Sequence, residues 1–450
     1  MGVEGSAGSR RRASHIDPRA GRRGDDCAAP APSAAPSSNP EAPTLTPDTR
    51  PLTLGVSVDS PPGVRRLTDP ALEKLARVLV AYSTRVKKGD LVRVSGDPVA
   101  LPLLEAIYEQ ALRIGAHPYI KLTPATLQDI FFEVADDAQL QYVSPLLMHE
   151  VQTIDVSIGL WAETNTKSLS MVDPTRQGMA SAARKPVFKI FMERAEKKEL
   201  RWSGTVYPTE ASAQDAEMSL RQYRQFVYRA GYLDLPDSVA KWQEIEQRQQ
   251  KVVDYLQGKK QVRFQTPSGT DLMVNVDGMT WINCCGHENF PDGEVFTGPN
   301  LDADDGGVNG VVRYSFPAVH NGREVDDIEL TFEKGRVTNA RASKNQDFLL
   351  AMLDQDEGAR NLGEIAIGTN YSITQYSKNT LFDEKIGGTF HAAVGAGYPE
   401  TGNTNESGLH WDMVCDLRSE TEGGGGTITV DGEVISRDGK FVVNGWPGAE

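Results

Sequence analysis

Three carboxylates and two histidines in the second half of the chain have side chains of the types that bind divalent metal ions: Glu294, Glu364, His391, His410 and Asp412. Both glutamates stand between a glycine and apolar residues, and an ionised carboxylate in such surroundings is costly to bury unless it meets a cation or good hydrogen-bond donors. Three such groups can hold one ion, whereas five, with one carboxylate bridging, can hold two ions about 3.5 to 4 Å apart. The number of groups therefore favours a pair of ions.

The ligand types and one spacing narrow this prediction further. Nitrogen and oxygen donors without a thiolate suit Zn, Co or Mn better than copper or an iron–sulfur cluster. His410 and Asp412 are two residues apart, so in a strand both side chains would leave the same face and Trp411 would lie on the other. This spacing is typical of two ligands of one site.

The same residues also allow interpretations without a catalytic metal. The histidines could cap or pack, and the acidic residues could pair with Arg360, Lys385 or Arg418. Glu294 and Glu364 could instead be the acid and base of a glycosidase, which needs two carboxyl groups about 5 to 9.5 Å apart. A non-catalytic metal-binding protein of the same fold is a further alternative. Spacing alone does not decide, because folding must bring distant residues together.

Other motifs that could carry chemistry are weaker. Ser95–Pro98 offers one glycine and one acidic residue where a phosphate would need several amide donors. The His-Glu pairs at residues 149–150 and 287–288 lack a second histidine four residues after the first, and no Gly-x-Ser-x-Gly elbow accompanies a suitable Asp and His. Cys284 and Cys285 could supply a thiol nucleophile, but free cysteines are more often small buried apolar residues.

The elements that must position these residues fall into two regions of different pattern. Residues 67–256 alternate helical periodicity with short β-branched runs, which predicts an α/β domain with a largely parallel sheet. Gly115 is the stop signal of the helix that completes its first βαβ unit. The predicted strands are 91–94, 118–122 and 154–160, and the predicted helices are 68–82, 101–114, 174–183 and 211–228, with helical pattern continuing to about 256.

Residues 257–450 consist mostly of short strands broken by Gly, Asn and Asp, which predicts a strand-rich α+β catalytic domain. One helix is expected at 345–353, and a closing hairpin pairs 427–431 with 433–441 around Gly432. The other predicted strands are 261–265, 272–276, 310–316, 328–332 and 336–342.

The first 66 residues differ from both regions. An arginine cluster is followed by an Ala/Pro/Ser/Thr tract with few large apolar side chains, so we expect a disordered low-complexity tail. Ordered patterning begins near Leu67.

Composition excludes several classes of partner. The chain of 450 residues has 47 Lys plus Arg against 62 Asp plus Glu, a formal charge of −15 that repels nucleic acid and anionic membranes. No stretch approaches the roughly 18 to 20 consecutive apolar residues that span a bilayer. Four cysteines in so long a chain form no disulfide framework, so a reducing, cytoplasmic location is expected.

Several strings of the chain, in the same order, resemble the aminopeptidase T and aminopeptidase S family of thermophilic metallo-aminopeptidases. The likeness is dense from about Asp292 to the C-terminus, looser over residues 67–260 and absent from the first 60. The strings that carry it are Asp292–Thr297, Asp356–Arg360, Leu362–Glu364, Leu381–Thr389, Tyr398–Glu400 and His410–Val414.

The resemblance implies a peptide hydrolase with two divalent ions (Zn, Co or Mn), peptide substrates and a homodimeric assembly. The ligands it implies are the five residues already singled out, with Glu364 bridging, and Tyr398 would lie beside the ions. A hydroxide bridging the ions would then attack the first peptide bond of the substrate. Tyr398 would donate a hydrogen bond to the developing oxyanion. Glu384 is the candidate proton shuttle; an exposed glutamate paired with Lys385 is the alternative for this residue, and Glu400 is a weaker candidate for the role.

Overall fold

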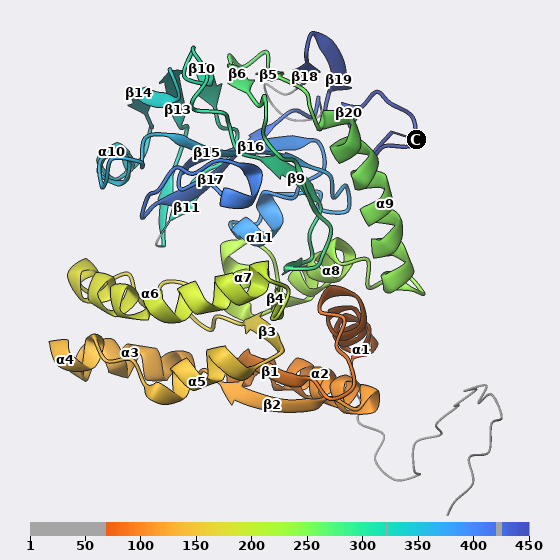
Figure 1. The fold of residues 1–450 in the computed structure, drawn as a ribbon, viewed down its shortest axis with the longest axis vertical. Coiled ribbons are helices and arrows are strands. Elements are labelled where there is room, and N and C mark those ends of the chain that lie inside the picture. Colours follow the sequence, from red (N-terminus) through yellow and green to blue (C-terminus); the bar gives the residue numbers. More distant parts are fainter. Residues whose placement is uncertain (1–68, 321, 420–424, 450) are drawn as a thin grey trace, which may run out of the picture. The chain divides into compact units, whose positions relative to one another are not determined.

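The computed structural model describes residues 69–320, 322–419 and 425–449. The predicted tail, residues 1–66, lies outside the described residues. The described chain is a mixture of helices with several separate sheets, as the sequence predicted (Figure 1). No helix within these ranges is both long and apolar enough to cross a lipid bilayer.

The first sheet has five parallel strands. They lie in the order β2 (His117–Leu122), β1 (Leu91–Gly96), β3 (Val156–Trp161), β4 (Arg201–Val206) and β8 (Asn289–Phe290). The parallel sheet expected within residues 67–256 is present, and β8 adds an edge strand from beyond residue 256. The division into domains at that residue stays a prediction.

The helices of this half begin and end where local signals place them. The helix expected at 101–114 has these bounds, with Pro102 in its first turn and Gly115 in the left-handed conformation at its end. The segment expected as one helix at 211–228 is broken into two. Three helices between residues 125 and 153 were not predicted. The helices are α1 (Pro70–Arg77), continued by a π-helical turn (Val78–Ser83), α2 (Leu101–Ile114), α3 (Ala125–Val134), α4 (Asp137–Leu140), α5 (Pro145–Thr153), α6 (Pro174–Glu196), α7 (Glu210–Asp215), α8 (Leu220–Ala230) and α9 (Ser238–Leu256).

The second half is strand-rich, as expected. An antiparallel sheet of eight strands contains the predicted closing hairpin, which makes a further turn at Asp438–Gly439. Its order is β14 (Arg336–Arg341), β13 (Glu329–Glu333), β10 (Val308–Arg313), β6 (Asp271–Asn275), β5 (Gln261–Gln265), β18 (Thr427–Val430), β19 (Glu433–Arg437) and β20 (Lys440–Phe441).

A second antiparallel sheet, of five strands, was not predicted apart from the strand around His410 and Asp412. Its order is β17 (His410–Asp416), β16 (Thr389–Gly395), β15 (Leu362–Gly368), β9 (Glu294–Thr297) and β7 (Ile282–Cys284). The remaining elements are β11 (Ala318–His320) paired with β12 (Arg323–Val325), α10 (Gln346–Leu353), α11 (Thr380–Asp383) and two 3₁₀ turns at Pro98–Ala100 and Pro399–Thr401.

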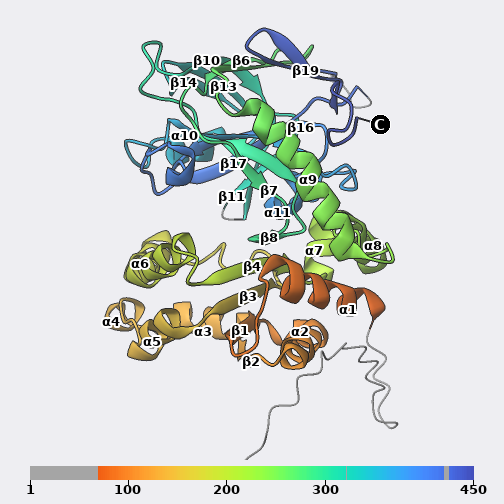
Figure 2. The same cartoon turned by 45° about the vertical axis from the view of Figure 1, so that its right-hand side comes forward.

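One face of the five-stranded antiparallel sheet packs against the eight-stranded sheet. Phe390 of β16 stacks on Phe264 of β5 with 4.1 Å between ring centroids, and Trp411 is buried in the same core. Figures 1 and 2 show α11 on the other side of this sheet, toward α7 and α8, and Phe382 of α11 packs on Phe226 of α8. The face opposite the core is therefore the one that can carry a site.

Candidate metal centre

The strand register directs all five predicted ligands to one face of the five-stranded sheet. Glu364 pairs with Ala393, and Ala393 pairs in turn with Asp412. Side chains alternate between the faces along a strand, while paired residues share a face. His391 stands two residues before Ala393, and His410 pairs with Gly395, so both histidines share this face. Glu294 joins the set through its pairing with Gly368 of β15.

Small residues make room between the ligands. Ala393 lies between Glu364 and Asp412 in the register, and Gly395 lies opposite His410. Gly395 has a φ of +101°, and a Cβ placed on it would lie 2.1 Å from the carbonyl oxygen of Leu409. Only glycine therefore fits where β16 meets the start of β17.

The ligand atoms of the five residues lie close together around Glu364. His391 Nε2 is 3.3 Å from Glu364 Oε1, whereas His410 Nε2 is 3.4 Å from Glu364 Oε2. His410 Nε2 is also 3.3 Å from Asp412 Oδ1, and His391 Nδ1 is 3.7 Å from Glu294 Oε2. Two groups of possible metal ligands result, and both contain Glu364: Glu294, Glu364, His391 and Glu364, His410, Asp412.

Backbone carbonyls orient both imidazoles. His391 Nδ1 lies 3.2 Å from the carbonyl oxygen of Glu384, and His410 Nδ1 lies 2.9 Å from that of Ala396. When Nδ1–H donates to these carbonyls, Nε2 faces the carboxylates, and its lone pair is available to a metal ion bound between them. This is the usual orientation of a histidine that binds a metal through Nε2.

The pKa values of the cluster are shifted because several carboxylates are buried close together, an arrangement that a bound cation would stabilise. Burial raises the pKa of Glu294 to about 8, although Lys385 beside it acts in the opposite direction. Burial alone would lower the pKa of His391, but the carboxylates around it, Glu364 first, raise it to about 10. The pKa of His410 is likewise raised to about 12, with Asp412 as the main cause against burial. Burial alone would raise the pKa of Asp412, but the neighbouring His410 lowers it below its usual value.

A buried lysine borders the cluster on the side of Glu294. Lys385 is fully buried and donates to Glu294 Oε1 at 2.6 Å and also to Glu384. Its ammonium lies 3.9 Å from buried Asp292, whose carboxylate accepts from the amides of Gly286 and Gly293. Because Lys385 occupies Oε1 of Glu294, the other oxygen of Glu294 is buried without a hydrogen-bond partner. That oxygen is free to bind a metal.

The structure thus brings all five predicted ligands together. Of the positive partners considered as alternatives, Arg360 binds Asp354 and Arg418 binds Asp416, while Lys385 does pair with Glu294. From the sequence, Lys385 was considered only as a partner of the acidic residues in place of a metal, or of Glu384, whereas the structure shows it buried and paired with both Glu294 and Glu384.

The predicted catalytic residues Glu384 and Tyr398 border the same cluster. Glu384 is only 13% exposed and pairs with Lys385, so its pairing was predicted correctly and its exposure was not. Burial raises its pKa. It forms a further group of possible ligands with His391 and Asp412.

Tyr398 packs its ring on His410, 5.1 Å between centroids, and on Phe296. Burial first, and then the surrounding carboxylates, raise the pKa of its phenol, which is therefore protonated at neutral pH. Glu400, the weaker candidate for the proton shuttle, is exposed.

The structure disfavours the alternative catalytic motifs considered from the sequence: the cysteine pair, the His149–Glu150 pair and a glycosidase pair of glutamates. Burial raises the pKa of both Cys284 and Cys285, which disfavours a thiolate nucleophile. Glu150 of the His-Glu pair at residues 149–150 forms ion pairs with Arg93 and Lys121, so its carboxylate is already neutralised by the protein. His391 lies between Glu294 and Glu364, where a glycosidase would need open space for a sugar.

The chemistry of the donor set fits divalent metal ions. Two imidazoles and three carboxylates face one another, one carboxylate oxygen is buried without a partner, and Glu364 offers one oxygen to each half of the cluster. Nitrogen and oxygen donors without thiolate suit Zn, Co or Mn.

Comparisons with known proteins agree with this chemistry. A family model described as thermophilic metalloprotease (M29) matches residues 68–441. Aminopeptidase 2 of Geobacillus stearothermophilus is 29% identical over 409 residues, which cover 82% of this chain and 95% of that protein. Aminopeptidase T of Thermus thermophilus is 27% identical over 364 residues, which cover 75% of this chain and 87% of that protein. The structure of wild-type AmpT from Thermus thermophilus matches with a TM-score of 0.71 at 25% identity and covers 83% of this chain and 99% of that one.

Proposed function

The chain belongs to the thermophilic metalloprotease (M29) family, and on that premise we propose that this metallo-aminopeptidase releases N-terminal residues from peptides at a centre of two divalent ions. Its relatives named aminopeptidase support the class of reaction. The number of ions, their identity and the role of each residue are the parts that we propose.

The observation that carries the proposal is the position of Glu364. One of its oxygens faces His391 and the other faces His410. A carboxylate shared in this way is suited to bridge two ions. Glu294 and His391 would complete one ligand set, and His410 and Asp412 the other.

Divalent ions bound there supply Lewis acidity, which lowers the pKa of a water and polarises the carbonyl group of the scissile bond. Zn, Co or Mn suits the donors. The carbonyls of Glu384 and Ala396 hold the two imidazoles in position. Lys385 holds Glu294 by one oxygen, so Glu294 would bind through the other.

Tyr398 and Glu384 would act on the substrate. The protonated phenol of Tyr398 donates a hydrogen bond to the oxyanion that develops on the scissile carbonyl. Glu384 moves a proton toward the leaving amine, a role that suits a carboxyl group whose pKa is raised by burial. A carboxylate of the centre would pair with the free α-amine of the substrate, and an internal peptide bond lacks that charge.

Chelation tests this function. We expect the hydrolysis of an amino-acid anilide to be lost after treatment with a chelator and restored by Co²⁺, Zn²⁺ or Mn²⁺. Activity unchanged by chelation would reject the proposal. A chain that binds two ions yet hydrolyses no peptide would instead favour the alternative of a non-catalytic metal-binding protein.

We further propose a cytoplasmic homodimer. Large apolar side chains are exposed on the helices α3, α5 and α6 and on the turn between α4 and α5, and exposed apolar patches are typical of subunit interfaces. They include Leu127, Ile130, Val134, Tyr142, Leu146 and Phe188. The cysteines of the described chain are free, which suits a reducing compartment. Sedimentation tests the assembly: the wild type should have the mass of two chains, and Ile130→Glu with Val134→Glu should shift it toward one.

A further inference from the structure

Glu384 borders the proposed metal centre without being one of its five proposed ligands. Its carboxylate lies close enough to His391 and Asp412 for the three residues to form a further group of possible ligands. Glu384 could therefore bind an ion or carry a proton, but one carboxylate cannot do both, because a bound ion occupies its lone pairs and lowers its pKa. What decides between the two roles is the other contact that this carboxylate makes.

Lys385 makes that contact. Its ammonium group donates to one oxygen of Glu384 and, at 2.6 Å, to Oε1 of Glu294. The side chain of Lys385 is only 1% exposed, so water cannot replace either carboxylate as its partner. A buried ammonium group that loses a charged partner is strongly destabilised. Glu384 is therefore held to Lys385 and does not turn freely toward an ion.

The position of Lys385 is itself fixed by the fold. Its carbonyl oxygen accepts from the amide of Asn370 at 3.0 Å, and the side chain of Asn370 donates to the carbonyl of Asp292. The ammonium group also lies 3.9 Å from the carboxylate of Asp292, which two backbone amides hold in place. The ammonium group therefore cannot follow Glu384 toward the centre.

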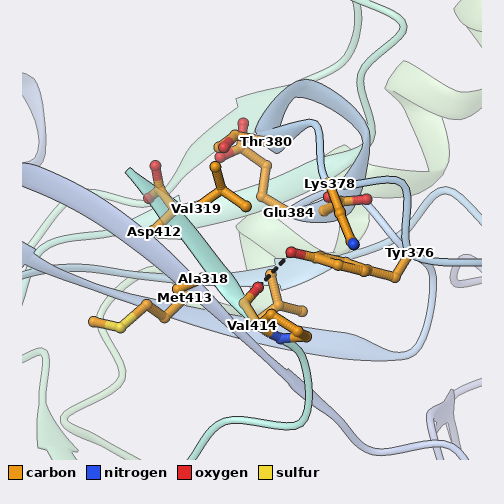
Figure 3. A pocket seen from close by; sticks show the side chains of 11 residues that line it. Ala318, Val319, Tyr376, Lys378, Thr380, Glu384, Asp412, Met413 and Val414 are labelled. Atoms are coloured by element: carbon orange, nitrogen blue, oxygen red, sulfur yellow. Dashed lines mark hydrogen bonds between the residues drawn. The ribbon is translucent and has the colours of Figure 1, made fainter. Parts of the chain in front are cut away.

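The two carboxylates bound to Lys385 differ in their surroundings. The second oxygen of Glu294 is buried without a hydrogen-bond partner, as suits a metal ligand. Glu384 instead lines a small pocket beside the centre, together with Asp412, and this pocket has room for about one water molecule (Figure 3). A carboxyl group in contact with water can take up and release a proton, which is what a shuttle must do.

We propose that Lys385 is a positioning residue, which holds the carboxyl group of Glu384 off the metal ions and so keeps it available for proton transfer. This role rests on the proposed two-metal function. Glu384 would take a proton from the attacking water and pass it to the nitrogen of the leaving amine, and so return to its starting state. One ammonium group thus has opposite consequences for its two partners, since Glu294 keeps an oxygen for the metal whereas Glu384 does not bind it.

Co²⁺ provides the test, because its visible absorption weakens as the number of ligands around the ion rises and so reports the ligand set independently of turnover. Glu384→Gln should bind two Co²⁺ ions per chain with the absorption of the wild type, while kcat for an amino-acid anilide falls by about a hundredfold or more. Lys385→Met should show weaker absorption per ion, because Glu384 then joins the ligand set, and should lose kcat to a similar extent. Lys385→Met combined with Glu384→Gln should regain the absorption of the wild type without regaining kcat.

Lys344→Met is the matched control. Lys344 also pairs with two carboxylates, those of Glu324 at 2.6 Å and Asp326 at 3.4 Å, but it is 50% exposed and lies outside the centre. Its substitution should change neither the Co²⁺ absorption nor kcat. Thermal melting of the Co²⁺-loaded chains checks that each variant is folded, and the comparison of Glu384→Gln with the wild type does not depend on a Lys385 variant.

Other outcomes overturn the inference in distinguishable ways. A lost ion or a changed absorption in Glu384→Gln would make Glu384 a metal ligand of the wild type, and an unchanged kcat would remove it as the shuttle. Wild-type absorption in Lys385→Met, or an altered absorption that persists in the double variant, would show that Lys385 does not act through Glu384. A wild-type chain that hydrolyses no anilide would overturn the proposed function, while the absorption spectra would still decide whether Lys385 keeps Glu384 from the ions.

Discussion

Glu364 differs from the other carboxylates of the centre because its two oxygens face different histidines. The histidines are His391 at 3.3 Å and His410 at 3.4 Å, and each is held from behind by a backbone carbonyl. Glu294, in contrast, gives one oxygen to Lys385 and keeps the other free. The sequence indicated which side chains could bind a metal, and the structure adds how each one is oriented.

Tyr398→Phe tests the proposed oxyanion donor. The substitution removes the hydroxyl and leaves the ring contacts with Phe296 and His410 in place. Loss of one such donor typically lowers kcat by about 10² to 10³. We therefore expect kcat for an amino-acid anilide to fall by about this factor, with KM and the bound metal unchanged. A wild-type kcat in the variant would remove Tyr398 from the proposed chemistry.

The five-stranded antiparallel sheet is the element that sequence patterns did not predict. The strands β15 and β16 are buried on both faces along their whole length, so their sequences show no alternation of apolar and polar residues. β17 was predictable because His410 and Asp412 alternate with buried Trp411. Helices with clear end signals, such as α2, were predicted with their observed bounds. Elements with one solvent-exposed face or a clear end signal can thus be predicted from the sequence, whereas strands buried on both faces cannot.

The same reasoning explains which parts of the site were missed. The candidate metal ligands were recognised from their types and from the family resemblance. Lys385 was considered only as a possible ion-pair partner, because its burial beside Glu294 depends on segments about 90 residues apart meeting in the fold.

A pair of glycines tests how strand geometry positions His410. Gly395→Ala places a Cβ against the carbonyl of Leu409, where it would lie only 2.1 Å from the oxygen, and should displace the start of β17. Gly432→Ala is the matched control, since Gly432 also has a positive φ but nothing lies within 4 Å of a Cβ there.

The two variants should differ in stability and in activity. The control should lose about 1 to 2 kcal/mol of unfolding free energy from backbone strain alone, with activity unchanged. Gly395→Ala should lose more, together with most of the anilide hydrolysis. Equal effects of the two substitutions in denaturant unfolding and in kinetics would contradict the positioning role of Gly395.

For the whole molecule, the charges of the centre link stability to pH. In the metal-free protein the pKa of His391 is raised to about 10 and that of Glu294 to about 8. Both pKa values exceed those of the unfolded chain, so the folded chain retains more protons between about pH 7 and 9 and its stability falls as the pH rises through this range. The pKa values of Glu364 and Asp412 are lowered in the folded chain, so these two groups change the stability only at acidic pH.

Thermal melting should reveal this linkage. Metal binding displaces the retained protons, so the metal-loaded protein should lack the loss of stability. The difference in Tm between the loaded and the chelated protein should therefore widen from pH 7 to pH 9. Each retained proton contributes a slope of up to about 1.4 kcal/mol per pH unit. A difference in Tm that narrows over this range would contradict the charge assignment.

The number of ions in the active chain is the most direct test of the centre. The metal-free protein would be titrated with Zn²⁺ or Co²⁺ while bound metal is measured by mass spectrometry and hydrolysis of an amino-acid anilide is followed. We predict full activity at two ions per chain. Glu364→Gln should bind fewer ions and lose activity by about a hundredfold or more, and exposed Glu400→Gln should behave as the wild type. Full activity with one ion or none, or a Glu364→Gln variant that retains both ions and turnover, would contradict the proposed two-metal centre.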